Sequence, residues 1–539
     1  MNENERIKKE KDGLDVLEDI LGYSKTGFAS INPDDFTRMR WYGLYQQKPN
    51  EGHFMLRIKV PGGVLTSAQL RTVADITRIH ARDITDITTR QNFQFHWLTI
   101  ESLPDIFDRL AAVGISTAGA CGDIFRNVTG CPVAGIDPDE VFDARPWLNE
   151  INAFFLTNKD YSDLPRKFKT SIAGCPLHCS QPEINDIGAT AVKRDRLSGD
   201  SELGFQVRVG GGLSARPHFA KPLNMFVPQD KLLSIFEAVT GIFRDHGNRD
   251  NRKKARLKFL VDDWGIERFE AEVRERLDWT PDQGDDWAQP RKNFRDHIGV
   301  HAQKQEGLYW IGASILSGRL NAEQVYEAAR ISEEFGQGLV RTTNQQNLLF
   351  SDIPQQHIDA AQKALEAAGL VIDASPFRRA AVACTGNEFC NLALTETKKL
   401  IIEIVEHLEN TVSIDEPIRI NLNGCPNSCG QHHIGAIGLQ GCVVKQGGGV
   451  TVDGYDVALG GRLGADSRFV RAIWRKVPAT NVKFALENLL NGYIEQREEE
   501  DDFSDFVDRH SDEELANLMK TSFAEGVATP VPAGGPAED

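Results

Sequence analysis

The 539-residue chain has no long apolar run. No stretch of about 18 apolar residues, the length needed to cross a bilayer, occurs anywhere in it. Its first ten residues, MNENERIKKE, also lack the apolar segment of a secretory signal. These two absences exclude a membrane-spanning helix, and they predict a cytoplasmic protein without a membrane partner.

Positive charge is also scarce. Lys and Arg total 61 against 78 Asp and Glu, which gives a net charge of −17 at pH 7. General nucleic-acid binding is therefore excluded, because phosphate contacts need a surplus of cations. The hydrophobic content of 40% and the charged content of 26% are ordinary for a globular protein with an ample core. The length predicts about three or four domains.

Only nine cysteines are present, and four of them form two close pairs. These four are Cys384, Cys390, Cys425 and Cys429. The first pair follows a short apolar run, 379–384, and opens an expected helix at 392–409. The second pair follows a β-type run, 417–422, and lies in a turn marked by glycine and proline. Four thiolates can therefore converge on one centre.

Three interpretations of these cysteines are open. An iron–sulfur cluster suits thiolates in turns, because free backbone N–H groups there can donate hydrogen bonds to the sulfurs. Structural zinc prefers a shorter spacer than the five residues between Cys384 and Cys390. Inert buried thiols are the third interpretation, and disulfides are not expected without a secretory segment. The spacing favours a four-cysteine [4Fe–4S] cluster.

The chain also contains a long internal repeat. A strand–turn–helix–strand–helix order near 54–114 recurs near 309–369, offset by about 255 residues, and this alignment pairs Thr88 with Thr342. AGCPLHC at 173–179 answers NGCPNSC at 423–429. One long repeat predicts a pseudo-two-fold molecule in which matching loops surround a ligand between the halves. The helices expected in the repeat are 67–81, 103–113, 322–335 and 356–368.

The first half keeps part of the cysteine pattern. Its cysteines at the matching positions are Cys131, Cys175 and Cys179. The position that would answer Cys390 lies near Asp137. We interpret this set as a lapsed duplicate of the four-cysteine site. A second cluster completed by Cys121 is the alternative.

Basic residues gather at strand ends and turns of the first half. They include Arg57, Arg90, Arg126, Arg166, Lys167 and Lys169. Lys167 and Lys169 alternate along an expected strand, so both point to one face. A glycine loop, 210–212, follows Arg208, and 248–256 adds five cations. The loop fits no nucleotide fingerprint, and the set predicts a cationic cavity for a polyanion within an acidic protein.

These motifs make the chain resemble the sirohaem- and [4Fe–4S]-containing sulfite and nitrite reductases of assimilation. The resemblance covers about residues 37 to 500 and rests on TTRQNFQFH at 88–96, LPRKFK at 164–169, NRKKAR at 251–256 and the four cysteines. It implies an α+β, internally duplicated (pseudo-two-fold) fold of three domains, with mixed sheets flanked by helices. Sirohaem carries eight carboxylates, which accounts for a cationic cavity.

The resemblance also implies a division of the chain. The expected parts are an N-terminal arm at 1–36, paired ferredoxin-like half-domains at 37–120 and 300–372, a first sirohaem-binding domain at 121–299, a second domain binding cluster and sirohaem at 373–500, and an acidic flexible tail at 501–539. Within the arm a helical stretch is expected near 14–21, and within the tail a helix is expected at 512–519.

Three sets of site residues are implied by the resemblance. The cluster ligands are Cys384, Cys390, Cys425 and Cys429, and Cys429 also bridges the cluster to the sirohaem iron. The residues around the substrate anion are Arg57, Arg126, Lys167 and Lys169. The residues that hold the sirohaem carboxylates are Arg90, Gln94, His96, Arg166, Arg208, Gly210, Gly211 and Gly212.

The implied activity is the six-electron reduction of sulfite to sulfide by a monomer. Electrons must come from ferredoxin or another external one-electron donor, because no part of the chain resembles a flavin or NADPH module. Lys169 stands where plant and cyanobacterial nitrite reductases of the family tend to have asparagine, which favours sulfite. Reduction of nitrite to ammonia is the alternative, and a non-catalytic iron–sulfur redox sensor is a second one. Tyr45 and Cys121 are expected to pack separately, with contact in the substrate pocket as the alternative.

Overall fold

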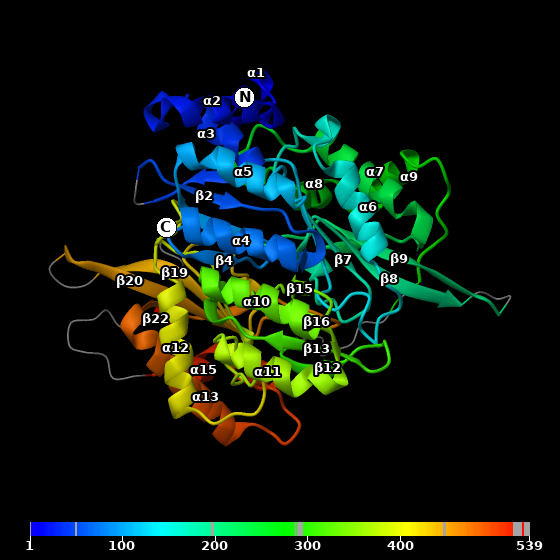
Figure 1. Cartoon of the computed structure of the whole chain (residues 1–539). Coiled ribbons are helices and arrows are strands. Elements are labelled where there is room, and N and C mark those ends of the chain that lie inside the picture. The colour runs from blue at the N-terminus through cyan, green and yellow to red at the C-terminus, as the bar shows by residue number, and fades with distance from the viewer. Residues whose placement is uncertain are drawn as a thin grey trace.

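In the part of the chain that the structure describes, four sheets are present, two of five strands and two of six, with helices packed beside them (Figure 1). The computed structural model describes residues 2–48, 51–195, 199–285, 287, 295–445, 449–520 and 531–532. None of the helices in these ranges combines the length and hydropathy that a bilayer crossing needs.

Two sheets are antiparallel. The first has the order β1-β2-β5-β4-β14, with β1 (Leu44–Gln46), β2 (Phe54–Arg57), β5 (Phe93–Leu98), β4 (Thr85–Ile87) and β14 (Arg319–Leu320). The second has the order β12-β13-β16-β15-β3, with β12 (Gly299–Ala302), β13 (Leu308–Ala313), β16 (Leu348–Pro354), β15 (Leu339–Thr342) and β3 (Val64–Thr66). Each repeat of the sequence contributes most of one sheet.

The two antiparallel sheets exchange an edge strand. β3 comes from the first half but pairs with β15, where Leu65 lies opposite Val340. β14 comes from the second half but pairs with β4, where Leu320 lies opposite Thr85. Neither sheet is therefore complete without the other half of the chain, and one hydrophobic core runs through both.

The helices on these sheets follow directly from the sequence pattern. α4 (Ser67–His80) and α10 (Ala322–Phe335) each begin at a capping box, formed by Thr66 with Gln69 and by Asn321 with Gln324. Buried positions recur at intervals of three and four residues, which places them on one face: Leu70, Val73, Ala74 and Thr77 in α4, and Val325, Ala328, Ala329 and Ser332 in α10. α5 (Leu103–Ala112) and α11 (Ile358–Ala367) complete the repeat. All four expected helices are confirmed within two residues at each end.

The turns of the two halves fix the register of the repeat. The Thr88 N–H donates to the Asn92 carbonyl at 2.8 Å, and the Thr343 N–H donates to the Asn347 carbonyl at 2.9 Å. Thr88 therefore answers Thr343, one residue later than the sequence alignment suggested.

The two larger sheets are mixed. One has the order β10-β9-β8-β7-β6, with β11 also on β9; its strands are β10 (Lys221–Pro222), β9 (Ser201–Val209), β8 (Ile187–Asp195), β7 (Phe168–Ala173), β6 (Phe125–Gly130) and β11 (Val227–Pro228). The other has the order β17-β18-β19-β20-β21-β22, with β17 (Ala381–Ala383), β18 (Ile420–Asn423), β19 (Ile437–Lys445), β20 (Thr451–Leu459), β21 (Arg471–Pro478) and β22 (Val531–Pro532).

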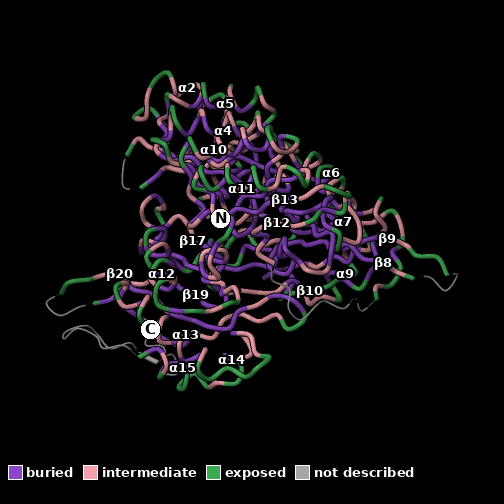
Figure 2. The backbone as a smooth tube through the Cα atoms, turned by 60° about the horizontal axis from the view of Figure 1, so that its bottom comes forward, coloured by how far each residue is buried: buried purple, intermediate pink, exposed green. Residues whose placement is uncertain are grey.

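In both mixed sheets the first three strands in chain order are parallel, β6-β7-β8 in one and β17-β18-β19 in the other. The next strand, β9 or β20, is antiparallel to them. Parallel neighbours need a crossover, and α6 (Arg145–Phe155) and α12 (Lys398–Thr411) lie in the first crossover of each sheet. The hairpins β8–β9 and β19–β20 project on opposite sides of the molecule, and Figure 2 shows exposed residues toward their tips. α7 (Leu232–His246), α8 (Leu257–Trp264) and α9 (Ile266–Glu275) belong to the first domain, and α13 (Ala479–Gln496) to the second.

Two expected boundaries differ from the structure. The helix expected from Leu392 begins only at Lys398, because the Glu396 side chain accepts the N–H groups of Lys399 and Leu400 and thereby caps the helix there. Residues 503–518, expected within a flexible tail, form α14 (Phe503–Arg509) and α15 (Asp512–Leu518). Phe503, Phe506 and Leu515 are buried in the core of the second domain, so apolar burial orders this part of the acidic segment.

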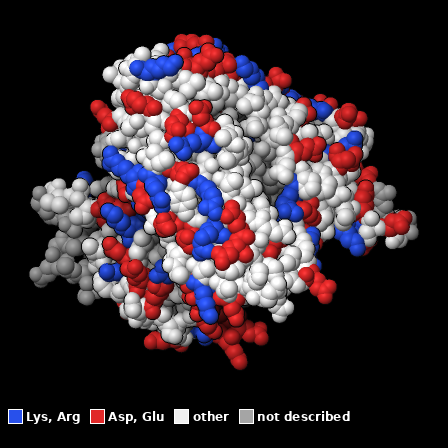
Figure 3. All heavy atoms as spheres, viewed as in Figure 1, with Lys and Arg blue, Asp and Glu red and all other residues white. Residues whose placement is uncertain are grey.

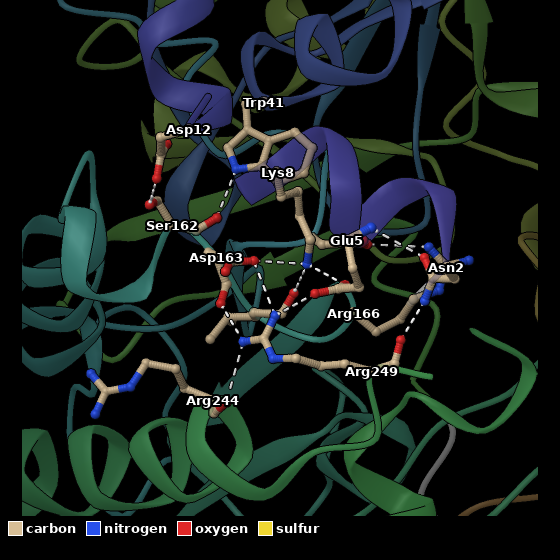
Figure 4. A network of polar contacts seen from close by, with 12 residues as sticks. Asn2, Glu5, Lys8, Asp12, Trp41, Ser162, Asp163, Arg166, Arg244 and Arg249 are labelled. Carbon is tan, nitrogen blue, oxygen red and sulfur yellow. Dashed lines mark hydrogen bonds and ion pairs between the residues drawn. The ribbon is translucent and has the colours of Figure 1, made fainter. Parts of the chain in front are cut away.

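The N-terminal arm is attached to the first domain by a buried ion-pair network (Figure 4). It contains α1 (Glu3–Glu10), α2 (Leu17–Thr26) and α3 (Asp35–Arg38); the helical stretch expected near 14–21 falls in and just before α2. Lys8 Nζ lies 2.6 Å from Glu5 and 2.8 Å from Asp163, and it donates to the Leu164 carbonyl at 2.8 Å. Arg249 pairs with the same two carboxylates. These contacts fix the start of the basic segment that leads into β7.

Candidate functional site

The four cysteines of the two pairs lie in loops that follow neighbouring parallel strands. Cys384 comes directly after β17, and Cys425 comes shortly after β18. Parallel strands end at the same edge of a sheet, so the two loops meet there. Burial and the nearby Cys429 thiolate raise the pKa of Cys384 to about 12, and Cys429 also raises the pKa values of Cys390 and Cys425. The fold therefore gathers the four predicted ligands.

Backbone N–H groups point at these sulfurs. The Gly424 N–H donates to Cys384 Sγ at 3.3 Å. Other backbone donors come from Gly386 toward Cys384, from Leu392 and Ala393 toward Cys390, and from Asn427 toward Cys425. Such donors stabilise thiolates and tune the potential of an iron–sulfur cluster.

The spacing of the four sulfurs separates a cluster from a single metal ion. Four thiolates on one zinc ion, at Zn–S distances of about 2.3 Å, lie about 3.8 Å apart. Across the described residues, three or more potential ligand atoms lie within 4.8 Å of one another only at Cys131, Cys179 and His297. No three sulfurs of the four-cysteine set, all of it described, lie this close together, which does not suit a single zinc ion, and the backbone donors around the thiolates favour a [4Fe–4S] cluster.

Two of the predicted substrate arginines lie together beside Cys121. Arg57 Nη1 donates to Cys121 Sγ at 3.2 Å, and Arg126 Nε donates to the Gly122 carbonyl at 2.9 Å. Burial and then Cys121 raise the pKa of Tyr45, while Arg126 and Arg57 lower it. Tyr45 and Cys121 thus share this region with both arginines. Cys121 accepts the hydrogen bond from Arg57, and a second cluster completed by it stays an alternative prediction.

The two predicted substrate lysines lie at and just before the start of β7. Burial and the cations Arg166 and Arg256 lower the pKa of Lys167 to about 7. Burial and Lys167 lower the pKa of Lys169 well below its usual value. In both cases the Cys429 thiolate acts in the opposite direction. The two amino groups are therefore close to each other and within electrostatic reach of Cys429.

A pocket between the two halves joins basic residues of the first half to the second cysteine loop. Arg90, Lys169, Cys429, Gln181 and Gln431 are among the residues that line it. Gln181 Nε2 donates to Gln431 Oε1 at 3.0 Å, and Gln431 Nε2 donates to Gln181 Oε1 at 2.5 Å. The two glutamines follow the matching cysteine turns of the repeat, so their reciprocal contact marks the pseudo-two-fold axis. Of the nine cysteines, all described, Cys429 alone is exposed.

Arg90 and Gln94 connect this pocket to the surrounding loops. Arg90 Nη1 donates to Asn185 Oδ1 at 2.7 Å, and burial and Arg126 lower the pKa of Arg90 to about 9. Gln94 accepts a hydrogen bond from Arg57 Nε at 3.0 Å and donates to Thr385 Oγ1 in the first cysteine loop at 3.3 Å. The two halves thus meet through the predicted cofactor residues.

The remaining basic and glycine positions lie around the first mixed sheet. Arg166 pairs with Asp123 at 3.2 Å. Arg208, on β9, has its pKa lowered by burial. A Cβ atom at Gly211 would lie 2.5 Å from the Glu183 carbonyl oxygen, so only glycine allows this close approach. Gly210, with φ +82°, and Gly212 flank it.

His96, predicted to hold a cofactor carboxylate, also contacts the first cysteine loop, and its buried Nδ1 has no hydrogen-bond partner among the described residues. Its side chain is 0% exposed, its Nε2 lies 3.1 Å from Asp86 Oδ2, and its ring stacks on Phe389 at 4.0 Å. Phe389 belongs to the first cysteine loop, so the structure places His96 as a support of that loop.

His96 and Asp86 belong to an ionic network that the sequence analysis did not predict. Asp86 lies 2.9 Å from Arg319 and 3.4 Å from Lys398. Burial alone would raise the pKa of Asp86, but Lys398 and Arg319 hold it far below its usual range. The three residues come from distant segments and carry no local motif.

Lys59 was also missed, although it is two residues after Arg57 in an extended stretch and so shares its face.

Two family models match the chain, each once in either half. The one described as "Nitrite and sulphite reductase 4Fe-4S domain" matches residues 121–281 and 374–525. The one described as "Nitrite/Sulfite reductase ferredoxin-like half domain" matches residues 45–113 and 301–368.

Named relatives carry both substrate names. The chain is 38% identical to a ferredoxin–nitrite reductase of Synechococcus elongatus, over 91% of this chain and 96% of that protein. It is 37% identical to a sulfite reductase [ferredoxin] of Mycobacterium tuberculosis, over 96% of each. The solved structure of Mycobacterium tuberculosis NirA protein superposes with a TM-score of 0.90 at 37% identity, covering 95% of this chain and 97% of that one.

Proposed function

The chain belongs to the family of sirohaem- and [4Fe–4S]-containing nitrite and sulfite reductases, and on that basis we propose that it reduces sulfite to sulfide with electrons from a ferredoxin. Sulfur passes from oxidation state +4 to −2, so six electrons are needed and three oxygen atoms must leave as water. The protein must therefore bind a small anion, deliver protons and stabilise charge as each oxygen departs.

Both cofactors have suitable residues. Cys384, Cys390, Cys425 and Cys429 would hold the cluster, and the exposed Cys429 would also bridge it to sirohaem. The residues proposed for the sirohaem carboxylates are Arg90, Gln94, Arg166, Arg208 and the 210–212 loop. When bound, the two groups supply single electrons to the substrate.

The observation that carries the proposal is the pair of lysines beside Cys429. Fixed cations stabilise negative charge as it develops, and they act more strongly in a site shielded from water. A group with a pKa near the working pH can also donate protons, and the pKa of Lys167 is lowered to about 7 by burial and neighbouring cations. Arginine keeps its proton, so Arg57 and Arg126 would bind the anion while the lysines bind it and deliver protons.

The second lysine favours sulfite over nitrite. Sulfite carries up to two charges near neutral pH, whereas nitrite carries one. Lys169 adds a second amino group next to Lys167, and a doubly charged anion favours protonation of both amino groups more than a singly charged one does. Reduction of nitrite is the second candidate, because relatives at nearly equal identity are named for each substrate.

An electron donor would need access to the cysteine loops. Leu392 and Leu394, which follow Cys390, are 67% and 50% exposed, so this loop reaches the surface. On the face drawn in Figure 3, basic side chains over α4 and α10 lie among acidic ones, and Arg71 pairs with Glu333 at 2.5 Å. A basic docking region for an acidic ferredoxin would therefore lie away from this face. The exposed cysteine loop is the point at which we propose that electrons enter.

Replacement of Lys169 by asparagine tests the substrate. In steady-state assays with reduced methyl viologen as donor, Lys169→Asn should lower kcat/KM for sulfite by about 100-fold, which corresponds to about 2.7 kcal/mol of transition-state stabilisation. The loss for nitrite should be much smaller. Lys363→Asn, on an exposed position of α11, is the control. Equal losses for the two anions would remove the main support for sulfite.

A further inference from the structure

A compact group of metal-type ligands lies in the first half, apart from the four-cysteine site. The Sγ atoms of Cys131 and Cys179 and a ring nitrogen of His297 all lie within 4.8 Å of one another. Their exposed fractions are 5%, 8% and 1%. Cys131 follows β6, Cys179 lies in the loop between β7 and β8, and His297 precedes β12.

The imidazole of His297 is buried, and the thiol of Cys131 is its polar neighbour. Neither ring nitrogen makes a hydrogen bond of regular geometry with any other described residue. A buried polar atom left in this way costs free energy. The backbone at His297 also adopts φ +61°, the left-handed region that a residue with a side chain rarely occupies. The chain thus holds the ring against the two thiols at an energetic cost, which points to a ligand.

The surroundings of the group suit a buried ion. Val133, Ile136, Trp310 and Leu349 form an apolar shell with the two cysteines. Arg295, two residues before His297, is fixed by an ion pair with Asp137 at 2.9 Å. Cys175 lies in the same loop as Cys179 and is buried. It is outside the group within 4.8 Å, so it would have to move to become a fourth ligand.

We propose that Cys131, Cys179 and His297 bind one zinc ion, with Cys175 or a water molecule as the fourth ligand. Thiolate and imidazole together favour zinc. Ligand atoms at about 2.3 Å for sulfur and 2.0–2.1 Å for nitrogen lie about 3.3–3.8 Å apart around the ion, so a group within 4.8 Å needs only a small contraction. An iron–sulfur cluster would need a wider set, like that of the second half.

The proposed ion would join three segments. It would tie the end of β6 and the β7–β8 loop of the first mixed sheet to the segment that enters β12 of an antiparallel sheet. Its role would be structural, because zinc has no redox chemistry. The three cysteines interpreted from the sequence as a lapsed duplicate thus keep a metal site of another kind, completed by a histidine from outside the repeat pattern.

Metal analysis and zinc-edge X-ray absorption on the holoenzyme test the proposal, using protein grown with added zinc and purified without a metal-affinity column. We expect about one zinc per chain, with two or three sulfur ligands at about 2.3 Å and a nitrogen ligand at about 2.0 Å. Cys131→Ser and His297→Ala should lose the zinc and keep the full iron content. Cys442→Ser, which alters a half-buried cysteine in β19, should keep both metals.

Three results would overturn the proposal: wild-type protein without bound zinc, zinc coordinated only by oxygen and nitrogen, or zinc retained in both variants. Loss of iron in Cys131→Ser would instead indicate a second cluster. A mass lower by two hydrogens in the wild type, abolished in Cys179→Ser, would indicate a disulfide. Because the wild-type spectrum reports the ligands directly, the proposal is decided even if a variant fails to fold.

Discussion

Burial leaves the Lys59 amino group without a hydrogen-bond partner among the described residues. The residue is 4% exposed, and burial and Arg126 lower its pKa to about 7. Between this value and the 10.5 of a free lysine, the unfolded chain binds a proton that the folded protein does not. Lys59 therefore makes stability rise with pH across this window, by up to about 1.4 kcal/mol per pH unit. Below pH 7 its full destabilising effect is present.

Lys59→Met should remove this effect. The thermal midpoint at pH 7 should rise, and its increase between pH 7 and pH 9.5 should become smaller than in the wild type. Lys167 and Lys169 act with the same sign, so the difference between variant and wild type is the informative quantity. Lys59→Arg keeps the buried charge and should show no gain. A midpoint for Lys59→Met that does not rise at pH 7 would show that the amino group has a partner in solution.

Cys429 and Cys179 occupy matching positions of the repeat but differ in expected chemistry. Cys429→Ser should lose cluster iron and the electronic coupling between cluster and sirohaem, because one ligand is proposed to serve both. Cys179→Ser should leave both intact. Iron analysis and the electron paramagnetic resonance spectra of the two purified variants compare them directly. Equal iron loss in both would revive a second cluster in the first half.

The helices of the repeat were predictable because the sequence signals that start them and set their buried faces are local. α4 and α10 start at capping boxes and bury residues at intervals of three and four, and both features can be read within 15 residues of sequence. The exchange of β3 and β14 was not predictable. These strands have three and two residues, and their partners lie more than 200 residues away. No local pattern records such pairing.

The residues of the site also divide into those that local sequence predicts and those that only distant contacts bring together. Cations that cluster in sequence, such as Lys167 and Lys169, were found together in the structure. The contacts of His96 with Asp86 and Phe389 were not predictable, because these partners meet it only after the sheet and the cysteine loop have folded. The ligand set of Cys131, Cys179 and His297 was incomplete in the sequence, since no spacing rule connects the histidine to the cysteines.

Helix α1 holds the basic segment before β7 in position through Lys8. Lys8→Met would leave Glu5 and Asp163 with Arg249 as their remaining partner. Breaking a fully buried ion pair costs about 3–5 kcal/mol, but the Asp163 side chain is 46% exposed, so about 2 kcal/mol is expected here. The thermal midpoint should fall, and KM for sulfite should rise as the lysines lose their fixed position. Lys9→Met, exposed on the same helix, should change neither quantity.

The strand exchange makes the molecule one cooperative unit. Residues 1–298 alone would lack β14 and leave the edge of β4 unpaired, and residues 299–539 alone would lack β3. The shared core of the two antiparallel sheets would also be exposed on each piece. Neither half should give a cooperative thermal transition by circular dichroism when expressed alone, whereas co-expressed halves should co-purify as a complex. A half that melts cooperatively by itself would contradict this expectation.

The exchanged strands also record how such a molecule can arise. Two identical half-length chains related by a two-fold axis would swap the same edge strand, and their equivalent glutamines would meet on that axis as Gln181 and Gln431 do. In that ancestor every change would have appeared in both halves at once. Joining the copies into one gene ended that constraint. One half could then keep the electron-carrying site while its counterpart was free to specialise in holding the substrate.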